Sequence, residues 1–176
     1  MHQAILPAAV LAVLCATPAR AEKLELDHRL YTPLHQAMEK HGEGTVHFET
    51  RPGGGLFDRI LVRGESAESN WDEALELLVA PRKPRTLTAQ QWYTQFKPSR
   101  ETKCPAAVSL IEETEAAVTF SVDAPACGAG PGLTGLYKVA TGKTTLYLVA
   151  AKAKGVMTAE QRRSWLGVLA SARVSG

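Results

Sequence analysis

The sequence predicts an α+β domain: an antiparallel β-sheet with helices packed mainly on one face, and a C-terminal hairpin followed by a helix. Two observations predict this class. Strand-like segments rich in Leu, Val, Tyr and Thr fall in runs, and helix-like segments stand between the runs rather than after every strand. The last quarter of the chain then joins two strand-like segments, residues 136–140 and 144–152, to a final amphipathic segment.

The amino terminus predicts export. Residues 5–15 form an apolar run that is too short to span a bilayer, and Ala19-Arg20-Ala21 is a small-x-small cleavage site. We therefore expect residues 1–21 to be a signal peptide and residues 22–176 to form one domain in the periplasm. No later stretch is long and apolar enough to predict a transmembrane helix.

The cysteines fit the same compartment. Cys15 lies in the predicted signal peptide, and Leu14 before it does not match a lipobox, which argues against lipidation. Cys104 and Cys127 remain after cleavage, and a small even count in an exported chain predicts a disulfide. Its loop entropy would contribute about 3 kcal/mol. A metal or redox pair is the alternative, but neither cysteine belongs to a Cys-x-x-Cys motif.

The first part of the predicted domain carries short elements separated by turn residues. In order they are a strand or arm, a helix, a strand, a Gly-rich turn and a strand, over residues 22–30, 32–42, 45–50, 51–55 and 59–63. Pro33 suits the first position of the helix, and Gly42 would end it.

Two helices are predicted in the middle of the chain. Ser69 or Asn70 would cap the first, whose apolar stripe comprises Trp71, Leu75, Leu78 and Val79. Thr88 would begin the second with Gln91 completing a capping box, and Pro98 would end it. Trp92 and Phe96 are four residues apart and would share one face of this second helix.

Four strands and a helix complete the prediction. The strands cover residues 108–112, 117–123, 136–140 and 144–152, and the last is apolar on both faces, which predicts a central position. Gly142 would adopt a positive φ in the hairpin turn. Thr158 and Gln161 form a capping box for the final helix, whose apolar stripe comprises Trp165, Leu166, Leu169 and Ala172. The predicted core anchors are Trp71, Trp92 and Trp165.

The order of elements resembles that of PsbP-like domains, in which a terminal helix follows a long central hairpin, and this likeness concerns the fold alone. A more specific set of residues resembles an uncharacterised family of small exported proteins of Gram-negative bacteria, which share a Cys-Pro, a second Cys and a "slYvvqkA" strand before a Trp-containing helix. The set is Asn70-Trp71-x-Glu73, Cys104-Pro105, Cys127, Lys138, Gly142, Leu146-Tyr147-x-Val149, Lys152 and Trp165. This resemblance covers roughly residues 65–174, implies an exported protein with a disulfide, and brings no activity with it.

The sequence predicts no catalytic residues and no cofactor. Gly142-Lys143-Thr144 lacks the earlier Gly and the following helix of a P-loop, so it reads as a hairpin turn. The run from Cys127 to Gly132 lacks the glycine spacing of a dinucleotide-binding turn. There is no G-x-S-x-G motif, and the acids Glu112, Glu113 and Glu115 fit a solvated strand end.

The sequence also predicts no metal site. Four histidines cluster in the first third of the mature chain, but their spacing matches no metal motif and the predicted path would separate them. They are His28, His35, His41 and His47.

One basic surface is predicted, although the net charge is only +2. It comprises Arg82, Lys83, Arg85, Lys97, Arg100 and Lys103, and a second basic row comprises Lys138, Lys152 and Lys154. Such a surface suits an anionic envelope component or an acidic protein, and a solubilising role is the plainer interpretation. Nucleic acid is disfavoured by the compartment and by the lack of paired exposed aromatic residues.

The sequence therefore favours a non-catalytic binding or accessory protein of the envelope with an unknown partner. A hydrolase of envelope material using Glu or His is one alternative. An inhibitor or immunity-type protein is another, and it would use a protruding loop at residues 51–56 or 128–132.

Overall fold

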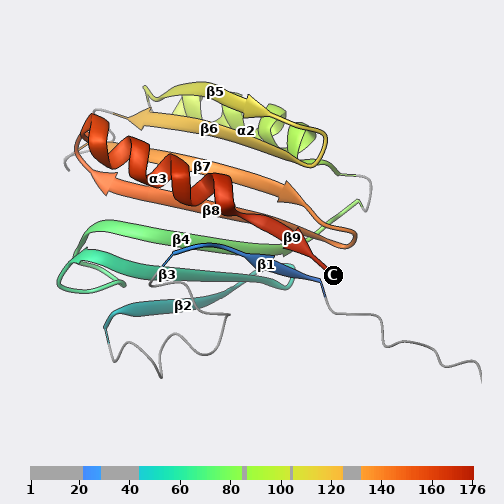
Figure 1. Cartoon of the computed structure of the whole chain (residues 1–176), viewed down its shortest axis with the longest axis horizontal. Coiled ribbons are helices and arrows are strands. Elements are labelled where there is room, and N and C mark those ends of the chain that lie inside the picture. Colours follow the sequence, from blue (N-terminus) through green and yellow to red (C-terminus); the bar gives the residue numbers. More distant parts are fainter. Residues whose placement is uncertain (1–21, 29–43, 85–86, 104, 125–131) are drawn as a thin grey trace, which may run out of the picture.

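The computed structural model describes residues 22–28, 44–84, 87–103, 105–124 and 132–176 (Figure 1). The predicted signal peptide, the predicted helix at 32–42, both Cys104 and Cys127, and Arg85 lie outside these residues. Export and the disulfide therefore stay predictions.

The domain is built on a seven-stranded antiparallel sheet in the order β2-β3-β4-β8-β7-β6-β5. These strands are β2 Val46–Arg51, β3 Gly55–Gly64, β4 Trp71–Pro81, β5 Ala107–Glu113, β6 Ala117–Ala124, β7 Leu133–Thr141 and β8 Thr145–Lys154. A second sheet of two strands pairs β1 Lys23–Glu25 with β9 Arg173–Ser175. The α+β class is confirmed, and β8 lies in the middle of the large sheet as its apolar faces predict.

The predicted helix after Asn70 is wrong, because this segment is strand β4. Its Glu, Ala and Leu residues favour helices, but β4 pairs along its length with β3 on one side and β8 on the other. Leu75 and Leu77 are buried on one face of the sheet, while Glu76 is buried on the opposite face. Tertiary pairing thus overrides local propensity in a segment whose apolar residues fit a period of two as well as a helical stripe.

The C-terminal hairpin and helix agree with the sequence prediction. Helix α3 spans Ala159–Ser171 and begins with a complete capping box between Thr158 and Gln161. Gly142 does not adopt the expected positive φ. Its missing side chain instead leaves room for the Glu22 carboxylate, which would lie 2.5 Å from an added Cβ.

Helix α2 spans Ala89–Lys103. The predicted capping box forms, because Thr88 and Gln91 each accept a hydrogen bond from the other's backbone amide through their side chains. Pro98 does not end the helix, which continues through it to Lys103. Thr94, whose carbonyl group the proline leaves without an N–H partner, is exposed, so water can bond that group.

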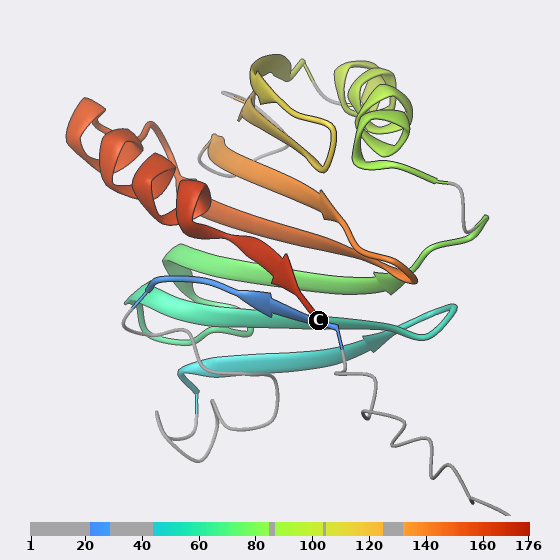
Figure 2. The ribbon, with the colours of Figure 1, turned by 45° about the vertical axis from the view of Figure 1, so that its right-hand side comes forward.

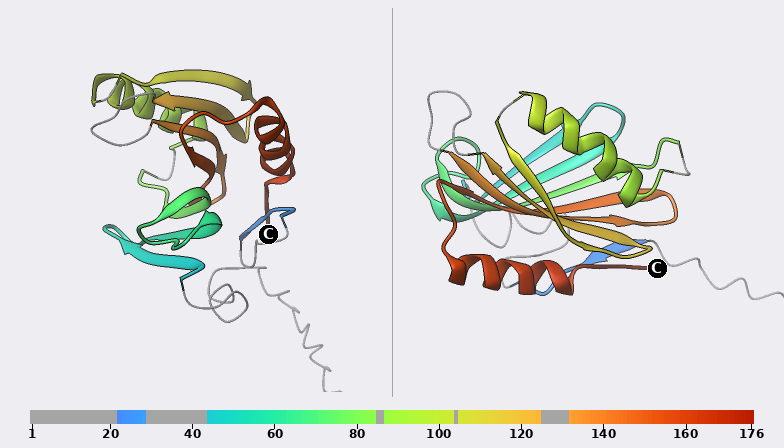
Figure 3. Two further views of the ribbon diagram at one scale, coloured as in Figure 1. Left: turned by 90° about the vertical axis from the view of Figure 1, so that its left-hand side faces the viewer. Right: turned by 90° about the horizontal axis from the view of Figure 1, so that it is seen from above.

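The two helices lie on opposite faces of the sheet, which corrects the expectation that helices pack mainly on one face. Trp165 and Leu169 of α3 pack with Leu136, whereas Trp92 and Phe96 of α2 pack with its neighbour Tyr137. Successive residues of a strand point to opposite faces, and Figure 3 shows the sheet between the two helices. Neither described helix is long and apolar enough to cross a bilayer.

Candidate ligand groove

Helix α2 covers only part of its face of the sheet. It contacts β5, β6 and β7, and Figure 2 shows it at the end of the sheet opposite β2. Over β3, β4 and β8 the same face forms a groove of about 500 Å³. Its floor comprises Leu78, Ala80 and Leu148, its walls comprise Phe57, Trp92 and Phe96, and its polar lining comprises Arg51, Glu76, Lys83, Arg100, Tyr137 and Lys152.

A buried carboxylate lies at one end of the groove. Glu76 is 3% exposed, and one of its oxygens accepts a hydrogen bond from Arg59 Nε at 2.8 Å. Its other oxygen forms an ion pair with Lys152 Nζ. The cross-strand register explains the cluster. Arg59 on β3 is directly opposite Glu76, and on β8 the residue opposite Glu76 is Ala150, two residues before Lys152 on the same face. Two cations against one carboxylate leave this cluster with one positive charge in excess.

Tyr137 lies beside this cluster. An added Cβ on Gly135 would meet the Tyr137 ring at 2.4 Å, so the ring lies across the glycine. Gly135 pairs with Lys152, and the Lys152 ammonium is 5.7 Å from the centre of the Tyr137 ring. Burial raises the pKa of the Tyr137 hydroxyl. The hydroxyl therefore stays protonated at neutral pH and can donate a hydrogen bond.

Cations and aromatic rings alternate along the β3 side of this face. Arg51 lies over Phe57 with its guanidinium carbon 4.7 Å from the ring centre. The Arg59 guanidinium carbon lies 5.4 Å from the ring centre of Phe57 and 5.1 Å from that of Trp71. The Lys154 ammonium nitrogen lies 5.4 Å from the ring centre of Trp71. These contacts hold Arg51 at the groove lining and Arg59 beside it on the same face.

The structure divides the predicted basic surface. Lys83 and Arg100 line the groove, and Arg100 stacks over Phe96 at 5.2 Å. Lys97 faces Glu101 one helical turn away. Arg85 lies outside the described residues, as does the side chain of Lys103.

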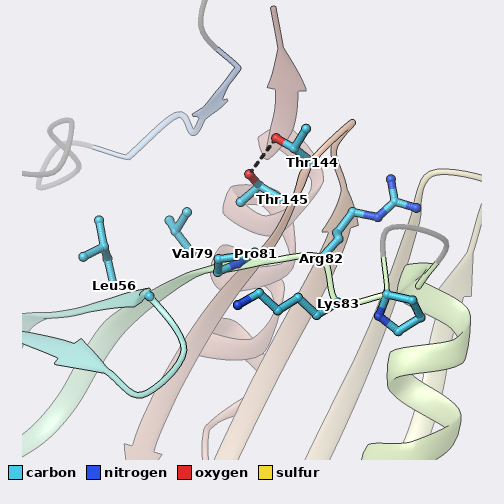
Figure 4. A pocket seen from close by; sticks show the side chains of 9 residues that line it. Leu56, Val79, Pro81, Arg82, Lys83, Thr144 and Thr145 are labelled. Carbon is cyan, nitrogen blue, oxygen red and sulfur yellow. Dashed lines mark hydrogen bonds between the residues drawn. The ribbon is translucent and has the colours of Figure 1, made fainter.

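Arg82 has a structural role instead. Its guanidinium donates to the carbonyl oxygens of Leu87, Gly142 and Lys143, so it ties the end of β4 to the β7–β8 turn. Figure 4 shows Arg82 and Lys83 diverging at a second hollow, whose lining includes Leu56 and Val79.

The second basic row is also split between the faces. Lys152 and Lys154 belong to the groove face. Lys138 points to the α3 face, where its ammonium donates to the carbonyl oxygen of Leu169 at 2.9 Å. There it serves as a cation at the helix C-terminus.

The three predicted core anchors have different environments. Trp165 is 5% exposed and belongs to the core beneath α3. Trp92 is half-buried and stacks on Phe96 with ring centres 4.9 Å apart. Trp71 is also half-buried, and the cations Arg59 and Lys154 contact its ring, so it is a surface platform rather than a core anchor.

The groove lacks the usual nucleophiles among its described lining residues. Glu76 is the sole carboxylate there, and no Ser, Cys or His accompanies it. Glycoside cleavage uses two acids, and Glu112, Glu113 and Glu115 are exposed at the far edge of the sheet. Across the described ranges no group of three or more His, Cys, Asp or Glu residues could hold a metal.

The described histidines are far apart in the fold. His28 stacks on Trp165 with ring centres 5.1 Å apart, beneath α3. His47 on β2 lies 3.9 Å from Glu49. His35 and His41 lie outside the described residues.

Sequence reasoning missed most of the groove. It identified Lys83, Arg100 and Lys152 as charges, but not Glu76, Tyr137 or the apolar floor. A signal was present, since Glu76 is an acid within the apolar run of β4, and Gly135 and Tyr137 have the spacing of same-face neighbours on a strand. The interpretation of β4 as a helix hid the first of these two signals.

No protein-family model matches the chain, and no curated protein matches it significantly. The resemblance to a family of exported proteins therefore stays a prediction.

Proposed function

We propose that this chain is a non-catalytic binding module of the bacterial envelope and that the groove is its ligand site. One observation carries the proposal: an apolar floor in the middle of the sheet is bordered by four cations and by one carboxylate that is already neutralised. Such a site suits a ligand that combines an apolar part with a negative charge.

The floor is unusual for central strands. Leu78 on β4 and Leu148 on β8 are cross-strand partners. Both side chains are only half-buried, although β4 and β8 are interior strands that each pair with a strand on either side. Apolar side chains at the centre of a sheet are normally covered. A bound ligand would supply that cover.

The envelope assignment comes from the predicted signal peptide and disulfide. The described residues support the bridge indirectly, because Ala107 pairs with Asp123, and Cys104 and Cys127 follow closely outside that pair along the chain. We propose a periplasmic protein with a Cys104–Cys127 disulfide. Expression with residues 1–21 and intact mass measurement should give a chain that begins at Glu22 and lacks the two thiol hydrogens. A retained leader, or two free thiols, would contradict this part.

The groove is tested with 1-anilinonaphthalene-8-sulfonate, an apolar anion whose fluorescence rises in apolar sites. We expect saturable binding that Leu148→Glu abolishes, because the new side chain places a negative charge on the apolar floor. The matched control is Leu110→Glu, since Leu110 is 49% exposed on edge strand β5, away from the groove. Equal binding by both variants, with native circular dichroism spectra, would remove the groove as the ligand site.

A further inference from the structure

The groove has a polar end and an apolar length, and this polarity identifies a ligand class. We propose that it binds a fatty acid, with the carboxylate at Lys152, Arg100 and Tyr137 and the acyl chain over Leu148 and Leu78. The inference rests on the proposed function and deepens it.

The polar end offers three donors. Lys152 and Arg59 together carry two positive charges, and Glu76 neutralises only one of them. The Lys152 side chain is 17% exposed. Arg100 lines the same groove from α2, held over Phe96. The Tyr137 hydroxyl, positioned by Gly135, adds a neutral donor. A carboxylate has two oxygens that accept such bonds, and charge-assisted bonds are the strong ones.

The apolar length follows from the register. Phe57, Leu78 and Leu148 are partners across β3, β4 and β8, so they form one row on the groove face. This row is next to the row of Arg59, Glu76 and Ala150 on the same face. A ligand whose charge lies at Lys152 must therefore pass directly onto apolar surface. Trp92 and Phe96 form the opposite wall.

Peptides and amines suit the groove less well. The backbones of β4 and β8 are already paired with their neighbours, so a peptide over this floor would leave its amides without partners. The cations also leave the groove positively charged, which disfavours amines. An acyl chain needs no hydrogen bonds along its length, and the volume of about 500 Å³ lies in the range of small-molecule sites.

The test compares ligands with equal tails on the whole processed chain. Dodecanoate, dodecanol and dodecylamine are titrated below their micellar concentrations, with butyrate as the head alone, by displacement of 1-anilinonaphthalene-8-sulfonate. We expect dodecanoate to bind at least about tenfold more tightly than dodecanol, as a charge-assisted hydrogen bond predicts. Dodecylamine should bind more weakly than dodecanol, and butyrate should not displace the dye.

Two variants locate the carboxylate. Arg100→Met and Lys152→Met should each reduce the preference for dodecanoate over dodecanol several-fold while dodecanol affinity stays unchanged. Lys97→Met removes the same charge from the same helix as Arg100→Met, but Lys97 faces Glu101 outside the groove lining, so the preference should persist. Arg100→Met keeps the test valid if Lys152→Met weakens the fold.

The outcomes separate the two proposals. Equal affinity for dodecanoate and dodecanol would overturn the fatty acid assignment and leave the groove as an apolar site. Displacement of dodecanoate by an acidic peptide at lower concentration would also overturn it. Absence of dye binding by the parent chain would refute the proposed function itself.

Discussion

Two buried glutamates on strand β4 show how differently the two faces of the sheet are used. Glu73 points to the α3 face, where its oxygens accept hydrogen bonds from Trp165 Nε1 at 2.6 Å and Gln161 Nε2 at 3.4 Å. Glu76 points to the other face, where its partners are the cations Arg59 and Lys152. On the α3 face the Glu73 carboxylate is bonded mainly by neutral donors of the helix. On the other face two cations pair with the single Glu76 carboxylate, which lies in the lining of the groove.

The difference shows which face of the sheet is left partly uncovered. The α3 face is closed at its centre, because Trp165 and Leu169 cover it and the β1–β9 sheet adds Leu24 and Val174 to the same core. On the other face α2 contacts β5, β6 and β7, and Leu148 of β8 is left half-buried. Spare charge and half-buried leucines are found on the face whose cover is incomplete. The predictions below test this contrast, starting with the largest expected effect.

Removing the tryptophan of each face should break the contrast most clearly. Trp165→Ala should lower the free energy of unfolding by about 4 kcal/mol, because it empties a buried site and removes the shorter of the two hydrogen bonds that Glu73 accepts. Trp92→Ala should cost about 1–2 kcal/mol, because that ring is half-buried at the groove wall. Urea unfolding followed by circular dichroism measures both. Similar losses would mean that the two faces are equally packed.

Removing the two acids compares their partners. Glu76→Ala should destabilise by about 3 kcal/mol, the lower end for broken buried pairs, since Arg59 and Lys152 are partly exposed. Glu73→Ala should cost about 2 kcal/mol, because it leaves neutral donors unpaired.

A combined replacement sharpens this comparison. Arg59→Met, Glu76→Leu and Lys152→Met together should recover most of the stability that Glu76→Ala loses, because no charge remains buried. The triple variant should still lose its preference for dodecanoate. If the triple variant is as unstable as Glu76→Ala, the ion pairs of Arg59 and Lys152 with Glu76 contribute to the stability of the fold.

The closed face also depends on the β7–β8 turn. The Glu22 carboxylate accepts hydrogen bonds from the backbone amides of Lys143 and Thr144, and Tyr147 donates to the Glu22 carbonyl at 3.1 Å. Gly142→Ala should displace this carboxylate and cost about 1 kcal/mol. In a double-mutant cycle Glu22→Ala should remove most of that cost. Additive losses would show that Gly142 acts independently of Glu22.

The smallest expected effect is the loss of stability of the β1–β9 pair at low pH. A hydrogen bond from Ser175, with Lys23 and Arg173 nearby, lowers the pKa of Glu25 below its ordinary 4.5. The carboxylate therefore stabilises the β1–β9 pair above pH 4.5, and this contribution is lost as the pH falls through the lower folded pKa. The protection of residues 23–25 and 173–175 against hydrogen exchange, relative to the unfolded chain at the same pH, should decrease there. Glu25→Gln should flatten that dependence while the groove strands stay unaffected.

Sequence patterns predicted the elements whose signals were local. The capping boxes at Thr88 and Thr158 and the two-sided apolar pattern of β8 all appear as expected. β4 was missed because its residues favour a helix by propensity, and only pairing with β3 and β8 decides the matter.

The groove could not be predicted for a related reason. Glu76, Tyr137 and Lys152 lie on three strands, and their proximity depends on register between segments far apart in the chain. Composition identified charges, but it could not show that Arg82 bonds backbone carbonyls while Lys152 pairs with a buried acid. The partial cover by α2 is likewise a property of packing.

The small sheet has a practical consequence. Lys23 pairs with Ser175, so a short Gly-rich linker can join residues 22 and 176. New ends can then be opened at the exposed Glu115 between β5 and β6. Such a circular permutant keeps every groove strand uninterrupted and moves the termini to the far edge, where a reporter domain can be fused without approaching the groove.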